Sequence, residues 1–121
     1  MSRESAIRAT FADIDAMDVD GFVGRLSEDV VFQFGNAEPV VGRSAVKEFV
    51  GQFFSTIKGL NHHIKNLWDV EDTTIVQIDV EYLRIDGHSV TVPNSDILTY
   101  DGDLVRDWRI YVDIAPLHAE V

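Results

Sequence analysis

The second half of the chain consists of strand-like runs separated by short turns, and this pattern constrains the fold most strongly. Four runs rich in β-branched and aromatic residues cover residues 61–68, 73–85, 88–100 and 103–114. Two of the three connections between them contain Asp-Gly, at residues 86–87 and 101–102. Asp-Gly between strand-like runs is a strong signal for a tight hairpin. The pattern therefore predicts an antiparallel meander of four strands.

The first half of the chain indicates three helices and one strand. Apolar residues at helical spacing predict helices over residues 5–17, 18–26 and 44–58, with Gly59 as the stop of the third. An apolar run at residues 30–34 indicates a strand between the second and third helices. Helices grouped before strands favour an α+β fold, with a curved sheet folded around the helices. The length of 121 residues predicts a single domain over residues 1–121.

Composition excludes several classes of function. The formal net charge is −11, and such a surface repels phosphate backbones and anionic lipid, so neither nucleic acid nor a membrane is expected as a partner. The chain has no cysteine and no apolar stretch long enough for a membrane span or a signal peptide, so we expect a cytoplasmic protein. The acidic residues between Asp13 and Asp20 do not have the spacing of a calcium loop. We expect no metal and no cofactor.

The last strand-like run has one polar and one apolar face. Alternate side chains of a strand point to opposite sides of the sheet. The polar face carries Asp107, Arg109, Tyr111 and Asp113, and the apolar face carries Trp108, Ile110 and Val112. We predict that the polar face lines an internal pocket. The apolar face would then be exposed, and because exposed apolar patches are seldom left uncovered, we also predict a homodimer through Trp108, Ile110 and Val112.

Three stretches, with the order of the elements, resemble the nuclear-transport-factor-2-like superfamily. They are Asp15 to Val30, the segment Pro39-Val40-Val41-Gly42-Arg43, and the last hairpin from Tyr100 to Asp113. The superfamily includes ketosteroid isomerases, SnoaL-like polyketide cyclases and limonene epoxide hydrolase. The resemblance covers nearly the whole chain and implies a cystatin-like α+β barrel. In that fold, three N-terminal helices pack in the concave face of a curved, mostly antiparallel sheet.

The resemblance also implies roles for particular residues. Asp96 stands at the position of the protonated Asp that donates a hydrogen bond in ketosteroid isomerase. The position of that enzyme's base is taken by Gln33, and the position of its Tyr donor by Thr10. His62 precedes Asn66 by four residues, a spacing found in several SnoaL-like relatives. A neutral histidine in a pocket can carry a proton near pH 7.

These observations define a set of candidate site residues. A purely structural role is the alternative for these residues. Asp96 or Asp107 could form an ion pair with Arg109. His62 and Tyr111 could be ordinary packed side chains. The candidate catalytic residues are Asp96, Asp113, His62 and Tyr111. The candidate substrate-binding residues are Gln33, Asp107, Arg109, Phe11, Phe53 and Leu98. Further apolar walls are expected from Phe22, Phe49, Ile78 and Val80.

An apolar pocket with a few polar groups suits a hydrophobic small molecule that bears a carbonyl or a hydroxyl group. The first hypothesis is a cofactor-independent proton-transfer enzyme of the isomerase, cyclase or dehydratase type. The second hypothesis is a non-catalytic ligand-binding or scaffold protein of the same fold. The third is an epoxide hydrolase. One fold hosts many activities, so the resemblance does not choose among these hypotheses.

Overall fold

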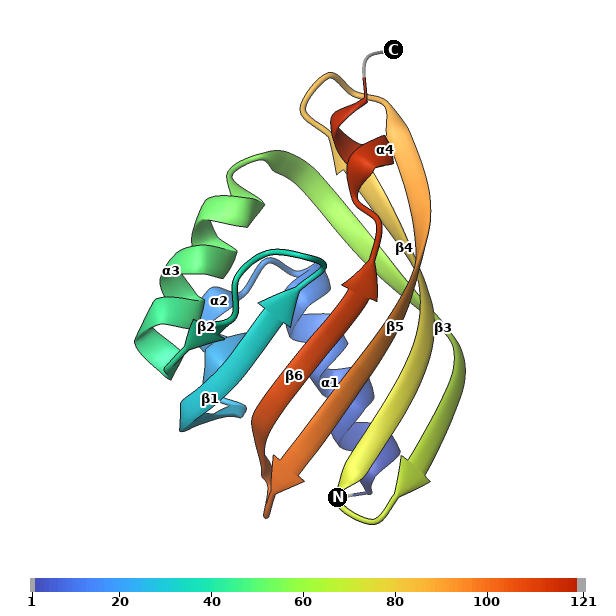
Figure 1. Cartoon of the computed structure of the whole chain (residues 1–121). Coiled ribbons are helices and arrows are strands. Elements are labelled where there is room, and N and C mark those ends of the chain that lie inside the picture. The colour runs from blue at the N-terminus through green and yellow to red at the C-terminus, as the bar shows by residue number, and fades with distance from the viewer. Residues whose placement is uncertain (1, 120–121) are drawn as a thin grey trace.

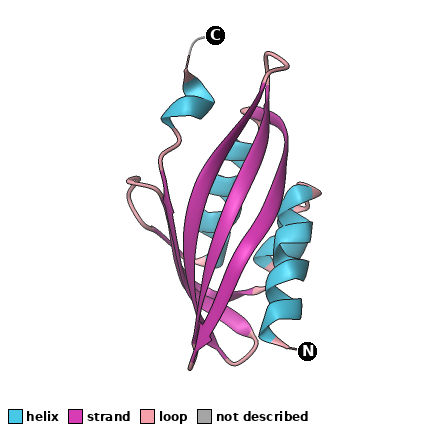
Figure 2. Ribbon diagram, turned by 90° about the vertical axis from the view of Figure 1, so that its right-hand side faces the viewer, coloured by secondary structure: helices cyan, strands magenta, loops and turns pink. Residues whose placement is uncertain are grey.

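The computed structural model describes residues 2–119 and shows a curved sheet wrapped around helices (Figures 1 and 2). The helices are α1 (Arg3–Asp15), α2 (Val19–Val23), α3 (Arg43–Phe54) and α4 (Ala115–His118). The strands are β1 (Leu26–Phe34), β2 (Val40–Val41), β3 (Ile57–Val70), β4 (Thr73–Arg84), β5 (Ser89–Asp101) and β6 (Leu104–Val112). The α+β class predicted from the sequence is confirmed.

The six strands form one sheet in the order β2-β1-β6-β5-β4-β3. The last four strands pair antiparallel in succession, as the hairpin pattern predicts. β1 lies parallel to β6, and in Figure 1 their arrows run side by side in the same direction. Because β1 and β6 are far apart in the sequence, this pairing joins the two halves of the chain into one sheet. The helices α1, α2 and α3 lie along the concave side of that sheet.

Several boundaries differ from those predicted. The strand β1 begins at Leu26, which the apolar periodicity had assigned to the second helix. Gly59 does not end α3, because the helix stops at Phe54 and the chain enters β3 at Ile57. At this end the hydroxyl groups of Ser55 and Thr56 donate to carbonyl oxygens of the last helical turn at 2.6 Å. Gly59 instead lies beside a register shift in β3.

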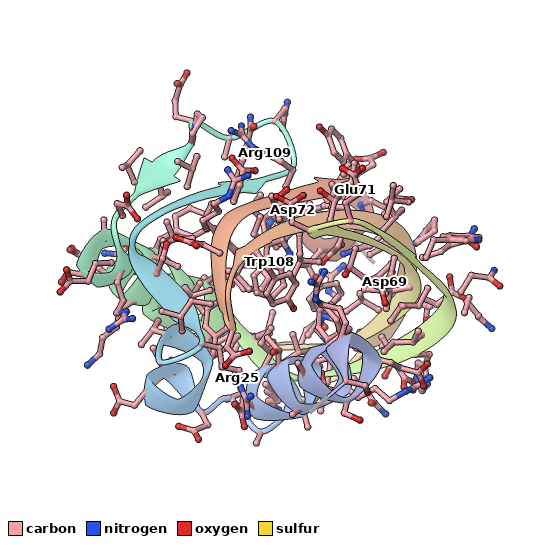
Figure 3. The ribbon with its side chains drawn as sticks, turned by 90° about the horizontal axis from the view of Figure 1, so that it is seen from below. Arg25, Asp69, Glu71, Asp72, Trp108 and Arg109 are labelled. Atoms are coloured by element: carbon pink, nitrogen blue, oxygen red, sulfur yellow. The ribbon has the colours of Figure 1, made fainter. Side chains whose placement is uncertain are left out.

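The predicted orientation of the last strand was wrong. Trp108 and Ile110 are only 1% and 8% exposed and belong to the core, whereas Tyr111 is 59% exposed. Figure 3 looks along the barrel and shows Trp108 inside the ring of strands and helices, with Arg109 outside. The apolar face of β6 is buried for the ordinary reason that transfer of apolar surface out of water is favourable. Trp108 and Ile110 therefore cannot form an interface with a second copy.

This orientation makes a stability prediction. Trp108→Ala should lower the free energy of unfolding by about 3–5 kcal/mol, because it removes a large side chain from the core and leaves a cavity. Tyr111→Ala, on the other face of the same strand, should change it by less than about 0.5 kcal/mol. Urea unfolding followed by circular dichroism measures both values. Equal losses in the two variants would contradict the orientation.

Candidate functional site

A cavity lies between the concave face of the sheet and the helices. Its empty space is about 480 Å³ including the open mouth, and much of that space is too narrow for water, so the walls are close together. The apolar lining consists of Phe11, Ile14, Phe22, Phe32, Phe34, Phe49, Val50, Phe53, Phe54, Leu60 and Ile110. The polar groups come from five further residues, His62, Tyr82, Asn94, Asp96 and Trp108. A mostly apolar cavity with a few polar groups is the usual form of a small-molecule site.

Asp96 is the buried acid of this cavity. It points inward from β5 and is 1% exposed. Its Oδ2 accepts a hydrogen bond of 3.0 Å from the indole Nε1 of Trp108, and its Oδ1 has no partner among the described residues. Burial raises the pKa of Asp96 to about 7, and the Trp108 hydrogen bond opposes this rise. When Asp96 is protonated, the proton belongs on Oδ1, because Oδ2 is already accepting.

A second polar group of the cavity is a pair formed by His62 and Asp15. The Nδ1 of His62, on β3, lies 2.5 Å from Oδ1 of Asp15, near the end of α1. Both oxygens of Asp15 also accept from the backbone N–H of His62, at 3.1 and 3.0 Å. The imidazole ring stacks on Phe11 with ring centroids 4.7 Å apart. A carboxylate at Nδ1 favours the tautomer in which Nδ1 carries the proton and Nε2 is free to accept one.

Two further polar groups of the cavity, Tyr82 and Asn94, were not among the predicted site residues. Asn94 is 5% exposed and its Oδ1 has no partner among the described residues. Tyr82 is 2% exposed, and burial together with the charge of Asp96 raises the pKa of its hydroxyl well above the ordinary value. The tyrosine is therefore a neutral hydroxyl donor at all ordinary pH values. Alternation along β4 and β5 could have found both, since Asn94 lies two residues before Asp96.

Four predicted site residues lie on the outer face of the sheet. Gln33, Asp107, Arg109 and Tyr111 were expected in the pocket, and none of them lines the cavity. Arg109 donates from Nε to Asp107 at 2.9 Å and from Nη1 to the side-chain oxygen of Gln33 at 2.8 Å. These contacts satisfy the polar groups at the surface, where burial does not penalise their charges. The prediction that this face lines a pocket was wrong.

The other predicted residues have different positions. Phe11 and Phe53 lie on the cavity wall, as do Phe22 and Phe49. Leu98 is fully buried but packs in the core away from the cavity lining, as do Ile78 and Val80. Asp113 is exposed, and its Oδ1 accepts from the backbone N–H of Ala115 at 3.0 Å. Asp113 therefore holds the chain at the start of α4 and lies outside the cavity lining.

Two other kinds of site were searched for between residues 2 and 119. No group of three or more His, Asp or Glu side chains in this range is arranged to hold a metal ion. No helix in the same range is both long enough and apolar enough to cross a membrane.

Comparison with solved structures shows the same fold in several bacterial proteins. A hypothetical protein of Catenulispora acidiphila with a ketosteroid isomerase-like fold, solved in complex with trimethylamine, is similar with a TM-score of 0.86 and 12% identity over 97% of this chain and 91% of that one. A SnoaL-like polyketide cyclase of Jannaschia sp., so described only provisionally, has a TM-score of 0.82 and 18% identity, over 94% and 87% of the two chains. An LEH-like epoxide hydrolase of M. tuberculosis has a TM-score of 0.80 and 14% identity, over 94% and 84%.

These likenesses establish the fold, and another protein of the same shape is described as a cystatin fold. A search of curated proteins gave no match. A family model, by contrast, matches residues 7–108, which extend from within α1 to the middle of β6. The superfamily resemblance predicted from the sequence is thus confirmed, and the chain belongs to the SnoaL-like domain family of the nuclear-transport-factor-2-like superfamily.

Proposed function

We propose that this protein is a cofactor-independent enzyme that moves a proton next to the carbonyl group of a small hydrophobic molecule. The observation that supports the proposal is the presence of a candidate base and a candidate acid in one apolar cavity. His62 has a free Nε2 because Asp15 holds Nδ1. Asp96 has an unpartnered Oδ1 and a raised pKa. Groups that accept and donate protons near neutral pH are what this chemistry requires.

In the proposed reaction, Nε2 of His62 takes the proton from the carbon next to the carbonyl. The negative charge that develops on the carbonyl oxygen is stabilised by the O–H of Asp96. Tyr82 and Asn94 are further donors in the same cavity. His62 then returns the proton to another carbon of the substrate, which gives isomerisation, or to a hydroxyl group that leaves as water, which gives dehydration. In a cyclisation the carbanion attacks a second carbonyl carbon of the same substrate, and His62 gives the proton to the oxygen of that carbonyl. The phenylalanine side chains exclude water and hold the apolar body of the substrate.

The base assignment is tested by replacing His62. His62→Gln should lower kcat for exchange of the α-hydrogen of a ketone substrate by about 10²- to 10⁴-fold, because it removes the acceptor nitrogen. His63→Gln is a matched control, since the neighbouring side chain is 49% exposed and lies beside Glu81 on the outer face. Proton NMR of hydrophobic enolisable ketones in heavy water measures the exchange.

An unchanged rate in His62→Gln would remove this residue from the mechanism. If ketones bind in the cavity and none exchanges its α-hydrogen, the protein is a ligand-binding protein and the second hypothesis holds. Epoxide hydrolysis is the remaining alternative. It is supported by the likeness to the mycobacterial protein, and the assay includes small epoxides to test it.

Asp96 predicts a dependence of stability on pH. Burial raises the pKa of Asp96 to about 7 in the folded protein, whereas in the unfolded chain the carboxyl group has its ordinary pKa of 3.8. The unfolded state therefore binds fewer protons between these pH values, and the free energy of unfolding falls as the pH rises through this window. Asp96→Asn removes this contribution. As the pH rises from 4 to 8, the free energy of unfolding of the variant should therefore rise by roughly 4 kcal/mol relative to that of wild type.

Urea unfolding at a series of pH values measures this difference. Asp101→Asn is the matched control, because Asp101 is an exposed acid on the same strand and its replacement changes the net charge equally. Parallel stability curves for wild type and Asp96→Asn would contradict a raised pKa for Asp96.

We propose further that two copies of the chain pack through the outer face of the sheet. Trp68, Ile75 and Ile97 are successive partners in the register across β3, β4 and β5. Trp68 is 50% exposed, and Tyr111 on β6 is 59% exposed. An apolar strip of this kind, bordered by the charged pair of Asp107 and Arg109, has the composition of a protein interface. This proposal is a new one, because the interface predicted from the sequence used Trp108 and Ile110, which are buried in the core.

Sedimentation velocity tests this interface. The wild-type chain should sediment with twice the mass of 13.6 kDa, and Ile97→Glu should convert it to the monomer, because the variant places an unpaired charge in the interface. Val41→Glu is the control, since Val41 is 63% exposed on β2, at the opposite edge of the sheet from β3. A wild-type monomer at high concentration would disprove the interface.

A further inference from the structure

The cavity is electrically unbalanced. Among its lining residues, which all lie in the described part of the chain, there is no lysine and no arginine. Asp96 is fully buried, and its only hydrogen-bond partner among the described residues is the neutral indole of Trp108. A buried carboxylate usually has a cationic partner or loses its charge. The second carboxylate, that of Asp15, is engaged by His62. No lysine or arginine of the cavity lining therefore pairs with Oδ1 of Asp96.

Aromatic rings make up much of the lining of the same cavity. The lining contains seven phenylalanines together with Trp108 and Tyr82. Phe11, Phe22 and Phe32 each meet Trp108 edge to face, with ring centroids 5.9, 5.5 and 5.7 Å apart. The face of an aromatic ring carries partial negative charge, and it attracts cations most strongly where water is excluded.

From these two observations we propose that the cavity binds cationic amines, with the positive group between the aromatic rings and Oδ1 of Asp96. The phenylalanine rings nearest the mouth hold the apolar substituents of the amine. Carboxylate ligands are excluded, because no positive side chain in the cavity compensates their charge and the chain carries a net charge of −11. The inference rests on the cavity of the proposed function but not on catalysis, so a binding test and a kinetic test can fail separately.

Binding of amines and of carbonyl compounds should depend on pH in opposite directions. A cation pairs with Asp96 when the carboxyl group is ionised, whereas a carbonyl oxygen needs the protonated form as a donor. Four other groups face this region: Tyr82 from β4, Trp108 from β6, and His62 from β3 with Asp15 from α1. Tyr82 and Trp108 stay neutral.

Three small molecules of the same shape separate charge from size. Choline carries a permanent positive charge, so any pH dependence of its binding comes from the protein. Dimethylbutanol is the neutral carbon analogue, and dimethylbutanoate is the anionic one. Above neutral pH we expect choline to bind about tenfold or more tightly than the alcohol, and the carboxylate not to bind. The advantage of choline should shrink as the pH falls from 8 to 5.

The two tryptophans report where the ligand binds. The indole N–H of Trp108 contacts Asp96 inside the cavity, whereas Trp68 is 50% exposed on the outer face. In a titration followed by nitrogen–proton NMR of the whole chain, the Trp108 signal should shift with choline concentration while the Trp68 signal stays in place. This internal comparison separates binding in the cavity from adsorption to the acidic surface.

The variant Asp96→Asn keeps the size of the side chain and removes its charge. It should weaken choline binding at pH 8 by about tenfold or more and abolish the pH dependence, while binding of the alcohol stays the same. Asp101→Asn should leave both unchanged. The proposal is wrong if choline fails to shift the Trp108 signal at pH 8, if the alcohol binds as tightly as choline, or if Asp96→Asn, folded as judged by its NMR spectrum, binds choline like wild type.

Discussion

The hydrogen bond from the indole of Trp108 to Asp96 joins the core of this protein to its cavity. It fixes a 1% exposed tryptophan on the inner face of β6 against a 1% exposed carboxyl group on β5. A buried indole N–H needs an acceptor, and a buried carboxyl group needs a donor. One contact meets both needs and leaves the second oxygen of Asp96 facing the cavity without a partner. Packing and chemistry here depend on the same pair of residues.

The shape of the sheet explains why the cavity exists. The strands β3 to β6 pair antiparallel over most of their length and curve around the helices, as Figures 2 and 3 show. Asp15, at the end of α1, contacts His62 on β3. Side chains of phenylalanine line the space that remains, and they leave it narrow. The position of His62 and the apolar character of the cavity thus follow from how α1 and α3 close the concave face.

The two proposed ligand classes would use one carboxyl group in its two charge states. Its protonated form is a hydrogen-bond donor for a developing oxyanion, and its ionised form is the counter-ion of an amine. The balance depends on desolvation of Asp96, which the surrounding aromatic and aliphatic side chains cause. No second charged group beside Asp96 is needed to raise its pKa.

The sequence by itself determined the order of the elements and the hairpins, because turn residues and alternation are local signals. It named Asp96 and His62 as candidates through a family resemblance, but it left open which of the adjacent His62 and His63 faces inward. It also placed Trp108 and Tyr111 on opposite faces of one strand. Local alternation does not say which face points inward, and the prediction chose the wrong one. Only the tertiary structure decided this, since burial of β6 depends on its pairing with β1 and on contacts with Phe11 and Phe22. The partnership of His62 with Asp15, 47 residues apart, was likewise decided by the packing of α1 on the sheet.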